Sequence, residues 1–302
     1  MKNYKVLVCE PVHPAALEKI KQFADILPSY DQLAEADAIV NRNLSLTREE
    51  LQKAKNLKVI GIHGTGTDGV DLEAAFEQSI QVFNVPSQNA ESVAELIVCQ
   101  ILMLARKIHP IQKKLMTGAP LSNTPAEFYG MELRGKTFGM LGVGEIAKRT
   151  CQILTEGFGM KAAGYSRSLT PELAEKYGIT YCASTEELLR QSDVVSVGLA
   201  LCKETEGWVG RLEFDQMKRS ALFINTARGK LVDEKALYAA LRDGKIAGAA
   251  CDVFESEPPT ELNPLLSLPN FIATPHIGAH TEEALYRVGM AVAEGIEARL
   301  VH

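Results

Sequence analysis

Short apolar runs alternate with amphipathic segments along the chain. In the first third, strand-like runs at residues 5–9, 38–40, 57–62 and 80–85 alternate with helix-like segments at residues 14–23, 48–54 and 72–78. The alternation resumes after Lys136, with strand-like runs at residues 138–141, 162–165, 194–197, 222–225, 248–253 and 271–273. Such alternation is typical of parallel sheets covered by helices. The pattern therefore predicts an α/β chain with two doubly wound parallel sheets.

Two further segments have the periodicity of long helices. Residues 90–114 carry one apolar face and read as a single helix long enough to bridge two domains. Residues 281–300 carry another apolar face, formed by Leu285, Val288, Val292, Ile296 and Leu300. A helix with such a face must pack against another part of the protein.

Composition narrows the class of protein. The 302 residues are 46% hydrophobic and 23% charged, which are ordinary values for a soluble chain of two domains. The net charge of −6 gives no basic surface for nucleic acid, and no apolar run is long enough to span a membrane. The N-terminus lacks the pattern of a signal peptide, so we expect a cytoplasmic protein.

The six cysteines are isolated in apolar segments. They have neither the C-x-x-C spacing nor the nearby histidines of a zinc site, so no metal is expected. They are interpreted as small core residues, with Cys202 the one ambiguous case because its loop should face the cofactor.

Three segments that follow strand-like runs carry candidate chemistry for reducing a 2-oxo acid. Arg228 can bind the carboxylate and polarise the carbonyl with its planar donors. His276 can give a proton to the carbonyl oxygen, and Glu257 can orient and charge that imidazole. The alternatives are a solvated arginine at a helix entry, an exposed loop acid and a buried core histidine.

The source of the hydride is indicated upstream. Gly142, Gly144 and Ala147 form G-x-G-x-x-A between a strand-like run and a helix-like segment. The first glycine permits a tight turn, the second lets backbone N–H groups approach a pyrophosphate, and the alanine allows close packing of helix on strand. A second strand-like run, ending in Tyr165 and Ser166, follows at the expected distance. This arrangement predicts a dinucleotide site.

In the order and spacing of its motifs, the chain resembles the D-isomer-specific 2-hydroxyacid dehydrogenase family, and in particular its phosphoglycerate dehydrogenase-like branch without a regulatory domain. The segments that carry the resemblance are His63–Asp71, Ser92–Leu96, Glu132–Thr137, Gly142–Ala147, Asn225–Gly229, Asp252–Pro258 and Thr274–Gly278. The likeness extends over nearly the whole chain. The resemblance implies a Rossmann nucleotide-binding domain at residues 94–280. It also implies a discontinuous, flavodoxin-like substrate domain at residues 1–93 and 281–302.

The resemblance also implies roles for further residues. Arg42 matches a family position near the substrate, although it can equally be a surface arginine, and Gly64, Thr65 and Gly66 form a nest whose N–H groups can bind the substrate carboxylate. The helix at residues 90–114 and the loop before Glu132 resemble the family's dimer-forming parts, so we expect a homodimer. The residues expected to bind the cofactor are Thr65, Gly142, Gly144, Glu145, Ile146, Ser166, Arg167, Ser168, Leu199, Thr226, Ala227, Arg228, Asp252, His276, Gly278 and Ala279.

Departures from the family pattern bear on cofactor and substrate. Where members that prefer NAD carry an aspartate for the ribose hydroxyls, this chain has Ser166, Arg167 and Ser168, which favours NADP, with NAD as the alternative. Residues 116–130 contain no lysine, arginine or tryptophan, whereas the phosphoglycerate branch has basic residues there and a phosphomonoester needs cations. Leu199 stands in a segment that replaces the usual His-x-Pro.

These departures favour a small unphosphorylated acid such as glyoxylate or hydroxypyruvate. Phosphoglycerate dehydrogenase activity is the alternative within enzymes, and a nucleotide-sensing scaffold like the family's corepressors is the alternative of another class. A formate dehydrogenase is disfavoured, because those members have glutamine where Glu257 stands.

Overall fold

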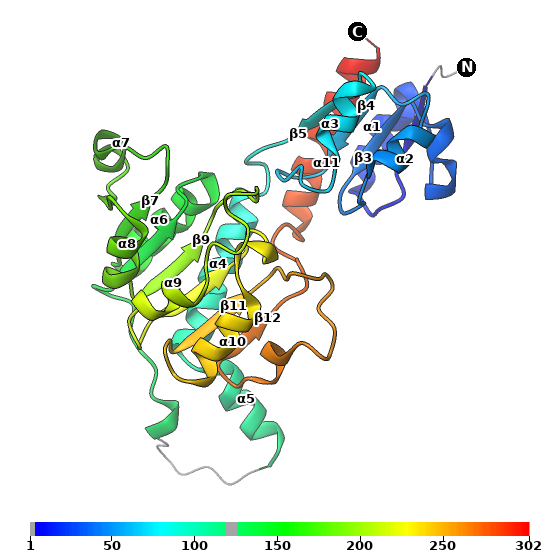
Figure 1. Ribbon diagram of the computed structural model, residues 1–302. Coiled ribbons are helices and arrows are strands. Elements are labelled where there is room, and N and C mark those ends of the chain that lie inside the picture. The colour runs from blue at the N-terminus through cyan, green and yellow to red at the C-terminus, as the bar shows by residue number, and fades with distance from the viewer. Residues whose placement is uncertain (1–3, 119–125, 302) are drawn as a thin grey trace. The chain divides into compact units, whose positions relative to one another are not determined.

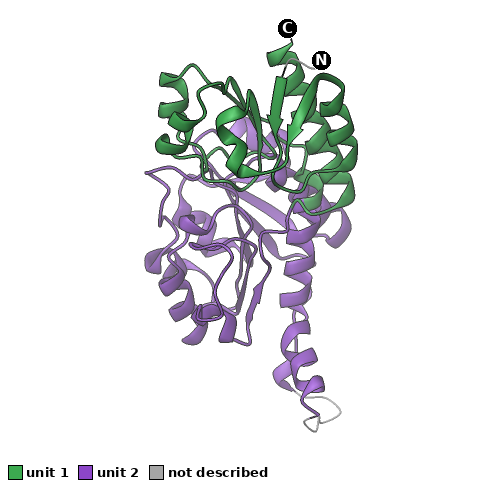
Figure 2. Ribbon diagram, turned by 90° about the vertical axis from the view of Figure 1, so that its right-hand side faces the viewer, with its two compact units in different colours: residues 1–92, 279–302 green, residues 93–278 purple. Residues whose placement is uncertain are grey.

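The computed structural model describes residues 4–118 and 126–301. The chain forms two compact units, Met1–Ser92 with Ala279–His302, and Val93–Gly278 (Figure 2). Both units are α/β, and each is built on one parallel sheet (Figure 1). We call them unit 1 and unit 2.

Unit 1 has five parallel strands in the order β2-β1-β3-β4-β5, the order of flavodoxin-like sheets. The strands are β1 (Tyr4–Leu7), β2 (Ala24–Leu27), β3 (Ala38–Asn41), β4 (Val59–Ile62) and β5 (Gln81–Asn84). The helices and turns are α1 (Pro14–Phe23), the 3-10 helix η1 (Tyr30–Glu35), α2 (Arg48–Lys53), α3 (Leu72–Glu77) and α11 (Glu282–Leu300). The apolar pattern did not predict β2, a four-residue strand at the edge of the sheet that follows α1 directly.

Helix α11 belongs to unit 1, where it packs against α1 and β4. Its apolar face is buried, with Val288, Val292 and Ile296 almost fully out of solvent beside Val6 and Val59 of the sheet. The predicted packing of this last helix is therefore satisfied by the N-terminal sheet.

Unit 2 has seven parallel strands in the order β12-β11-β10-β9-β6-β7-β8. They are β6 (Thr137–Leu141), β7 (Lys161–Tyr165), β8 (Thr180–Tyr181), β9 (Val194–Val197), β10 (Leu222–Asn225), β11 (Gly248–Cys251) and β12 (Phe271–Ala273). Numbered from β6, the order is that of a Rossmann sheet with one additional strand. The central strands β9, β10 and β11 are buried along their whole length, as expected for a parallel sheet covered on both faces. The pattern missed β8, which has only two residues and lies at the edge.

The longer helices around this sheet are α4 (Ala90–Ala105), which begins at the end of unit 1, α5 (Ile108–Met116), α6 (Glu145–Phe158) and α10 (Glu234–Arg242). The shorter ones are α7 (Pro171–Lys176), α8 (Thr185–Gln191), α9 (Arg211–Gln216) and the 3-10 helices η2 (Ala126–Phe128), η3 (Gly229–Leu231) and η4 (Pro264–Ser267).

The expectation of one continuous helix over residues 90–114 is wrong. The helix stops at Ala105, and α5 starts after Lys107, which has left-handed backbone angles (φ 52°, ψ 38°). Two causes are visible. Pro110 has no N–H and its ring would collide with the carbonyl of Arg106 in a continuous helix, and the carbonyl of Ala105 accepts a hydrogen bond from the N–H of Met131 instead.

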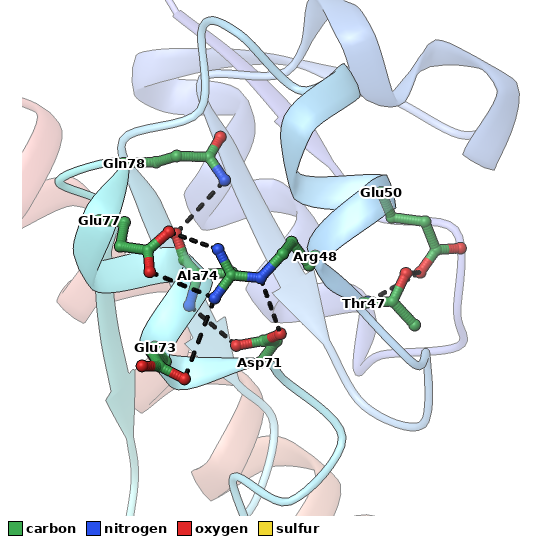
Figure 3. A network of polar contacts seen from close by, with 8 residues as sticks. All are labelled: Thr47, Arg48, Glu50, Asp71, Glu73, Ala74, Glu77 and Gln78. Atoms are coloured by element: carbon green, nitrogen blue, oxygen red, sulfur yellow. Dashed lines mark hydrogen bonds and ion pairs between the residues drawn. The ribbon is translucent and has the colours of Figure 1, made fainter.

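A polar network fixes the segment that joins β4 to α3 in unit 1. The guanidinium of Arg48, at the start of α2, pairs with Glu77 and lies near Asp71 and Glu73 (Figure 3). Asp71 in turn caps α3 by accepting from the N–H of Ala74 at 2.8 Å. Each ion pair is exposed and weak by itself, but the network holds the C-terminal end of the loop that contains Gly64, Thr65 and Gly66.

Candidate active site

The glycine turn after β6 has the geometry of a nucleotide-binding loop. Gly142 has φ 97°, and a Cβ atom there would lie 2.5 Å from the carbonyl oxygen of Gly198. Leu199 follows Gly198, and its Cδ2 would lie 3.1 Å from the same Cβ atom. Only glycine fits at position 142, because a larger residue would both strain the backbone and collide with the strand-end loop beside it.

Helix α6 starts at this turn without a side-chain cap. Its N-cap is Gly144, and nothing lies within 4 Å of the position that a Cβ atom would take there. Because Gly144 has no side chain, the space next to the N–H groups of Glu145 and Ile146 in the first turn stays open. An uncapped helix N-terminus with such space fits a pyrophosphate, which takes backbone N–H donors and the positive end of the helix dipole.

Strand β7 leads into the candidate ribose segment. Ser166 and Ser168 place their hydroxyl oxygens 3.4 Å apart, and Arg167 between them is exposed. The carboxyl group of Glu204 is influenced by this arginine: a hydrogen bond from the Cys202 thiol is the main cause that lowers its pKa, and the charge of Arg167 adds to it. The segment is therefore basic, with one acid close by.

The turn after β10 fixes Arg228. The side chain of Asn225 bridges the turn, donating from Nδ2 to the carbonyl of Arg228 at 3.0 Å and accepting from the N–H of Ala227 at 3.1 Å. Gly229 follows, and a Cβ atom there would lie 1.8 Å from the backbone of Phe254. The guanidinium donates to the carbonyl of Ala227 at 2.7 Å. The turn thus packs closely on the segment after β11, and this packing fixes the backbone from which the Arg228 side chain extends.

Glu257 lies in that segment and contacts His276. Its Oε1 accepts from the N–H of Phe254 at 3.1 Å, and its Oε2 lies 2.7 Å from Nδ1 of His276. Burial raises the pKa of Glu257, but the hydrogen bond and charge of His276, together with the N–H of Phe254 and the charge of Arg228, outweigh it and lower the pKa. A carboxylate only accepts, so Nδ1 of His276 carries a proton and Nε2 is the nitrogen left for other partners.

His276 itself has left-handed backbone angles (φ 55°), which are uncommon for a residue with a side chain. Asp252, buried at the end of β11, holds the surrounding segment. Its main-chain oxygen accepts from the N–H of His276 at 2.7 Å. Its carboxylate accepts from the N–H groups of Ile277 and Gly278 at 2.9 and 2.8 Å.

Arg228, Glu257 and His276 thus come from the carboxyl ends of β10, β11 and β12, three strands that neighbour each other in the sheet. The structure brings Glu257 and His276 into contact and puts the charge of Arg228 close enough to act on Glu257. Of the expected cofactor residues, Thr65 and Ala279 belong to unit 1 and the others to unit 2.

In unit 1, the expected substrate residues follow β3 and β4. Arg42 is anchored at both ends, by its backbone N–H to Glu10 Oε2 at 2.8 Å and by Nη1 to the carbonyl of Pro11 at 2.9 Å, and its Nη2 contacts Nε2 of His280. This half-buried arginine is not a free surface side chain. The nest residues are fixed by Asn84, whose Nδ2 donates to the carbonyl of Thr65 at 2.6 Å.

His63 begins one of the segments that carry the family resemblance, but it is not among the expected site residues. The structure buries it at 9% exposure, its Nε2 has no hydrogen-bond partner among the described residues, and burial together with the charge of Arg42 lowers its pKa to about 4. Neither Asn225 nor Thr274 nor Gln100 was assigned a function. The signal for Gln100 was present, as an amide in an otherwise apolar stretch of helix.

Across residues 4–118 and 126–301, no group of three or more His, Cys, Asp or Glu side chains is placed to hold a metal ion. The same ranges contain no helix with the length and hydropathy needed to cross a membrane.

Comparison with known proteins agrees with this geometry. Residues 98–278 match the family described as D-isomer specific 2-hydroxyacid dehydrogenase, NAD binding domain. The D-3-phosphoglycerate dehydrogenase of Methanocaldococcus jannaschii is 39% identical over 97% of this chain, which spans only 57% of that protein. The glyoxylate reductase of Aeropyrum pernix is 36% identical, with 99% of this chain and 93% of that protein covered.

Solved structures are similar over the whole chain. The D-lactate dehydrogenase of Aquifex aeolicus, complexed with NAD and lactic acid, superposes with a TM-score of 0.86 at 29% identity, covering 97% of this chain and 94% of that one. An acyclic imino acid reductase in complex with NADPH and D-Arg has a TM-score of 0.87 at 27% identity, covering 98% and 97%. The match of the family to most of the chain, and of relatives to nearly all of it, leads to one conclusion: this protein belongs to the D-isomer-specific 2-hydroxyacid dehydrogenase family.

Proposed function

We propose that the protein interconverts a small 2-oxo acid and the corresponding D-2-hydroxy acid with a nicotinamide cofactor. The observation that carries this proposal is the contact between Glu257 Oε2 and His276 Nδ1 at 2.7 Å, beside the charge of Arg228 and in the same unit as the glycine turn. Reduction of a 2-oxo acid needs a proton donor and a cation that binds the substrate carboxylate. His276, held by Glu257, is suited to the first role, and the planar guanidinium of Arg228 to the second.

Each side chain has a defined part in this reaction. The cofactor, when bound at Gly142–Ile146, supplies or accepts the hydride. The guanidinium of Arg228 binds the substrate carboxylate and polarises the carbonyl. His276 donates a proton from Nε2 to the carbonyl oxygen during reduction, and the Glu257 carboxylate stabilises its charged form and fixes the ring. In unit 1, the nest at Gly64, Thr65 and Gly66 and the anchored Arg42 are proposed to complete the recognition of the acid.

We propose glyoxylate or hydroxypyruvate as the substrate. The glyoxylate reductase relative matches over nearly its full length, and residues 116–130 contain no cation for a phosphate group. Part of that segment, residues 119–125, lies outside the described residues. D-3-phosphoglycerate is the second candidate, favoured by the 39% identity to the phosphoglycerate dehydrogenase.

For the cofactor we propose NADP rather than NAD. The support is the pair of hydroxyls of Ser166 and Ser168 around Arg167, with no acid at the end of β7 to receive ribose hydroxyls or repel a 2′-phosphate. Glu204 acts against this preference, because its carboxylate interacts with the charge of Arg167 and would repel a 2′-phosphate.

We also propose a cytoplasmic homodimer, formed through α4. A shallow depression of about 440 Å³ lies on this helix and is almost entirely apolar. It is lined by Glu95, Val98, Cys99, Leu102, Met103 and Arg106 of α4 and its end, with Ile108 and Ile153. An exposed apolar patch on a soluble unit favours contact with another protein surface.

A substrate panel tests the proposed activity. Glyoxylate, hydroxypyruvate, pyruvate and 3-phosphohydroxypyruvate are each offered with NADPH and with NADH, and the loss of nicotinamide absorbance is followed. The proposal expects the highest kcat/KM for glyoxylate or hydroxypyruvate with NADPH. Preference for 3-phosphohydroxypyruvate would replace it by the second candidate, and turnover of none of the four would favour a nucleotide-sensing scaffold.

A further inference from the structure

Holding His276 in place requires more than its contact with Glu257. The left-handed backbone at position 276 is unfavourable for a residue with a Cβ atom, so surrounding contacts must enforce it. The imidazole can serve a reacting carbonyl only if this backbone, and therefore the position of Nε2, stays fixed.

Asp252 provides the enforcing contacts. It accepts hydrogen bonds from three consecutive backbone N–H groups, those of His276, Ile277 and Gly278, through its main-chain oxygen, Oδ1 and Oδ2 respectively. The carboxylate is 1% exposed, so all of these contacts are made away from water. The Asp252 side chain thus holds the two residues directly after His276, and its main-chain oxygen holds His276 itself.

Thr274 also holds that carboxylate, at the same oxygen that accepts from the N–H of Ile277. Its hydroxyl donates to Asp252 Oδ1 at 2.5 Å. A hydroxyl has one proton, so its contact with Gln100 Nε2 at 3.3 Å must be one in which the amide of Gln100 donates. Three side chains therefore form a directed relay, in which Gln100 donates to Thr274 and Thr274 donates to Asp252.

Gln100 begins this relay at a position where an apolar residue would be expected. It lies on α4 between Cys99 and Ile101, is 1% exposed, and its Oε1 is buried without a hydrogen-bond partner among the described residues. A buried amide that satisfies only one of its two ends costs stability relative to leucine, so packing alone does not account for it.

We propose that Gln100 and Thr274 are positioning residues for the proton donor: their hydrogen bonds orient the Asp252 carboxylate, which holds the backbone directly after His276 at Ile277 and Gly278. The proposal rests on the proposed reductase function for its kinetic consequences, but not for its structural ones. It assigns Asp252 to the support of His276 in addition to the contact with the cofactor expected from its position.

The first test compares Thr274→Val, Thr274→Ser, Gln100→Leu and the double variant Gln100→Leu/Thr274→Val in the full chain. We expect kcat to fall ~10-fold to 100-fold in Thr274→Val, because a misplaced imidazole loses alignment with the carbonyl. Gln100→Leu should lose ~3-fold to 10-fold, the worth of one hydrogen bond. Thr274→Ser, which keeps the hydroxyl, should restore most of the rate.

Three readouts separate positioning from mere loss of structure. The double variant should be no slower than Thr274→Val, because both changes break the same relay. The rate of reduction should fall at lower pH than in the wild type, because a displaced ring loses its support from Glu257. Gln191→Leu and Thr155→Val, which remove hydrogen-bonding side chains elsewhere in unit 2, should leave kcat unchanged.

Amide hydrogen exchange tests the relay without any substrate. The N–H groups of Ile277 and Gly278 should be protected in the wild type and should exchange faster in Thr274→Val and Gln100→Leu, with protection restored in Thr274→Ser. Unchanged protection at both amides, or kcat losses that multiply in the double variant, would overturn the proposal. If the wild type reduces none of the 2-oxo acids, the proposed function fails, and the exchange data alone decide whether the relay exists.

Discussion

His276 and Glu257 meet at 2.7 Å although they follow different strands, β12 and β11, which are neighbours in the sheet of unit 2. The contact involves Nδ1 of the imidazole, so the opposite nitrogen faces away from the carboxylate. The pair is thus arranged as a proton donor with a fixed tautomer, and the first two predictions test each member.

Replacing His276 by glutamine should lower kcat for reduction ~10²-fold to 10⁴-fold, the usual contribution of a general acid. Binding of NADPH, measured by nicotinamide fluorescence, should change little because the glycine turn is untouched. A variant that reduces hydroxypyruvate at the rate of the wild type would show that His276 is not the donor.

Replacing Glu257 by glutamine should move the pH dependence of the reaction. The amide keeps the shape but no longer stabilises a charged imidazole, so the reduction rate should begin to fall at a lower pH than in the wild type. Rate profiles of both proteins between about pH 5 and 9 measure this, and coincident profiles would separate Glu257 from the proton donor.

The same residue makes a prediction about stability. The pKa of Glu257 is lowered in the folded chain, so the unfolded chain binds its proton more readily. The ionised Glu257 therefore stabilises the folded chain fully above pH 4.5, the ordinary pKa of a glutamate. This stabilisation is lost as the pH falls through the lower pKa of Glu257 in the folded chain. Glu257→Gln should melt at a lower temperature than the wild type at neutral pH, and the difference should shrink below pH 4.5.

His63 should make unit 1 sensitive to mild acid. Burial and the charge of Arg42 lower its pKa from 6.5 to about 4, so the unfolded chain binds the proton more tightly and stability falls as the pH drops from 6.5 toward 4. The full difference is worth about 3 kcal/mol, and it is present only above pH 6.5. Urea unfolding of the wild type and of His63→Gln should show this slope in the wild type alone. In the wild type, the NMR shifts of the His63 ring protons should also stay constant between pH 7 and about 5.

The cofactor assignment depends on Ser166, Arg167 and Ser168. A charge-assisted hydrogen bond from Arg167 to the 2′-phosphate should be worth ~1.5 to 3 kcal/mol, or roughly tenfold to a hundredfold in affinity. Ser166→Asp combined with Arg167→Ala should therefore reverse the preference from NADPH to NADH, measured as kcat/KM with one 2-oxo acid.

Glu204→Gln is the matched control for this pair. It removes the carboxylate that interacts with the charge of Arg167, so NADPH binding should strengthen while NADH binding stays the same. A wild type that already prefers NADH would contradict the assignment before any variant is made.

The proposed dimer predicts that Met103→Glu, which places a charge in the apolar depression on α4, shifts the protein toward monomer. Light scattering at micromolar concentration measures the mass of both proteins. A monomeric wild type would refute the proposed assembly.

The sequence predicted the fold because its strands are continuous apolar runs whose ends carry glycine, proline or charge. β9, β10 and β12 have the predicted bounds, and Arg228, Glu257 and His276 lie just beyond strand ends as expected. The edge strands β2 and β8 were missed because a strand paired on one side needs little apolar length. The break at Lys107 was missed because the apolar spacing continues across it, although Pro110 carried the signal.

The support of the site was less visible. Gln100, Thr274 and Asp252 are far apart in the sequence, and their hydrogen bonds exist only once α4 lies against the strand ends of unit 2. Likewise the lowered pKa of His63 depends on its burial and on the charges of Arg42 and His280, which come from other segments of unit 1. Tertiary contacts of this kind leave no periodic trace in a sequence.

The central claim is that this chain delivers hydride and proton to a 2-oxo acid to give the D-2-hydroxy acid. The most direct measurement incubates the wild type and His276→Gln with hydroxypyruvate and NADPH and analyses the product by chiral chromatography against the nicotinamide consumed. The account predicts D-glycerate in equal amount to the NADPH oxidised by the wild type, and almost none from the variant. L-glycerate, or equal product from both proteins, would contradict it.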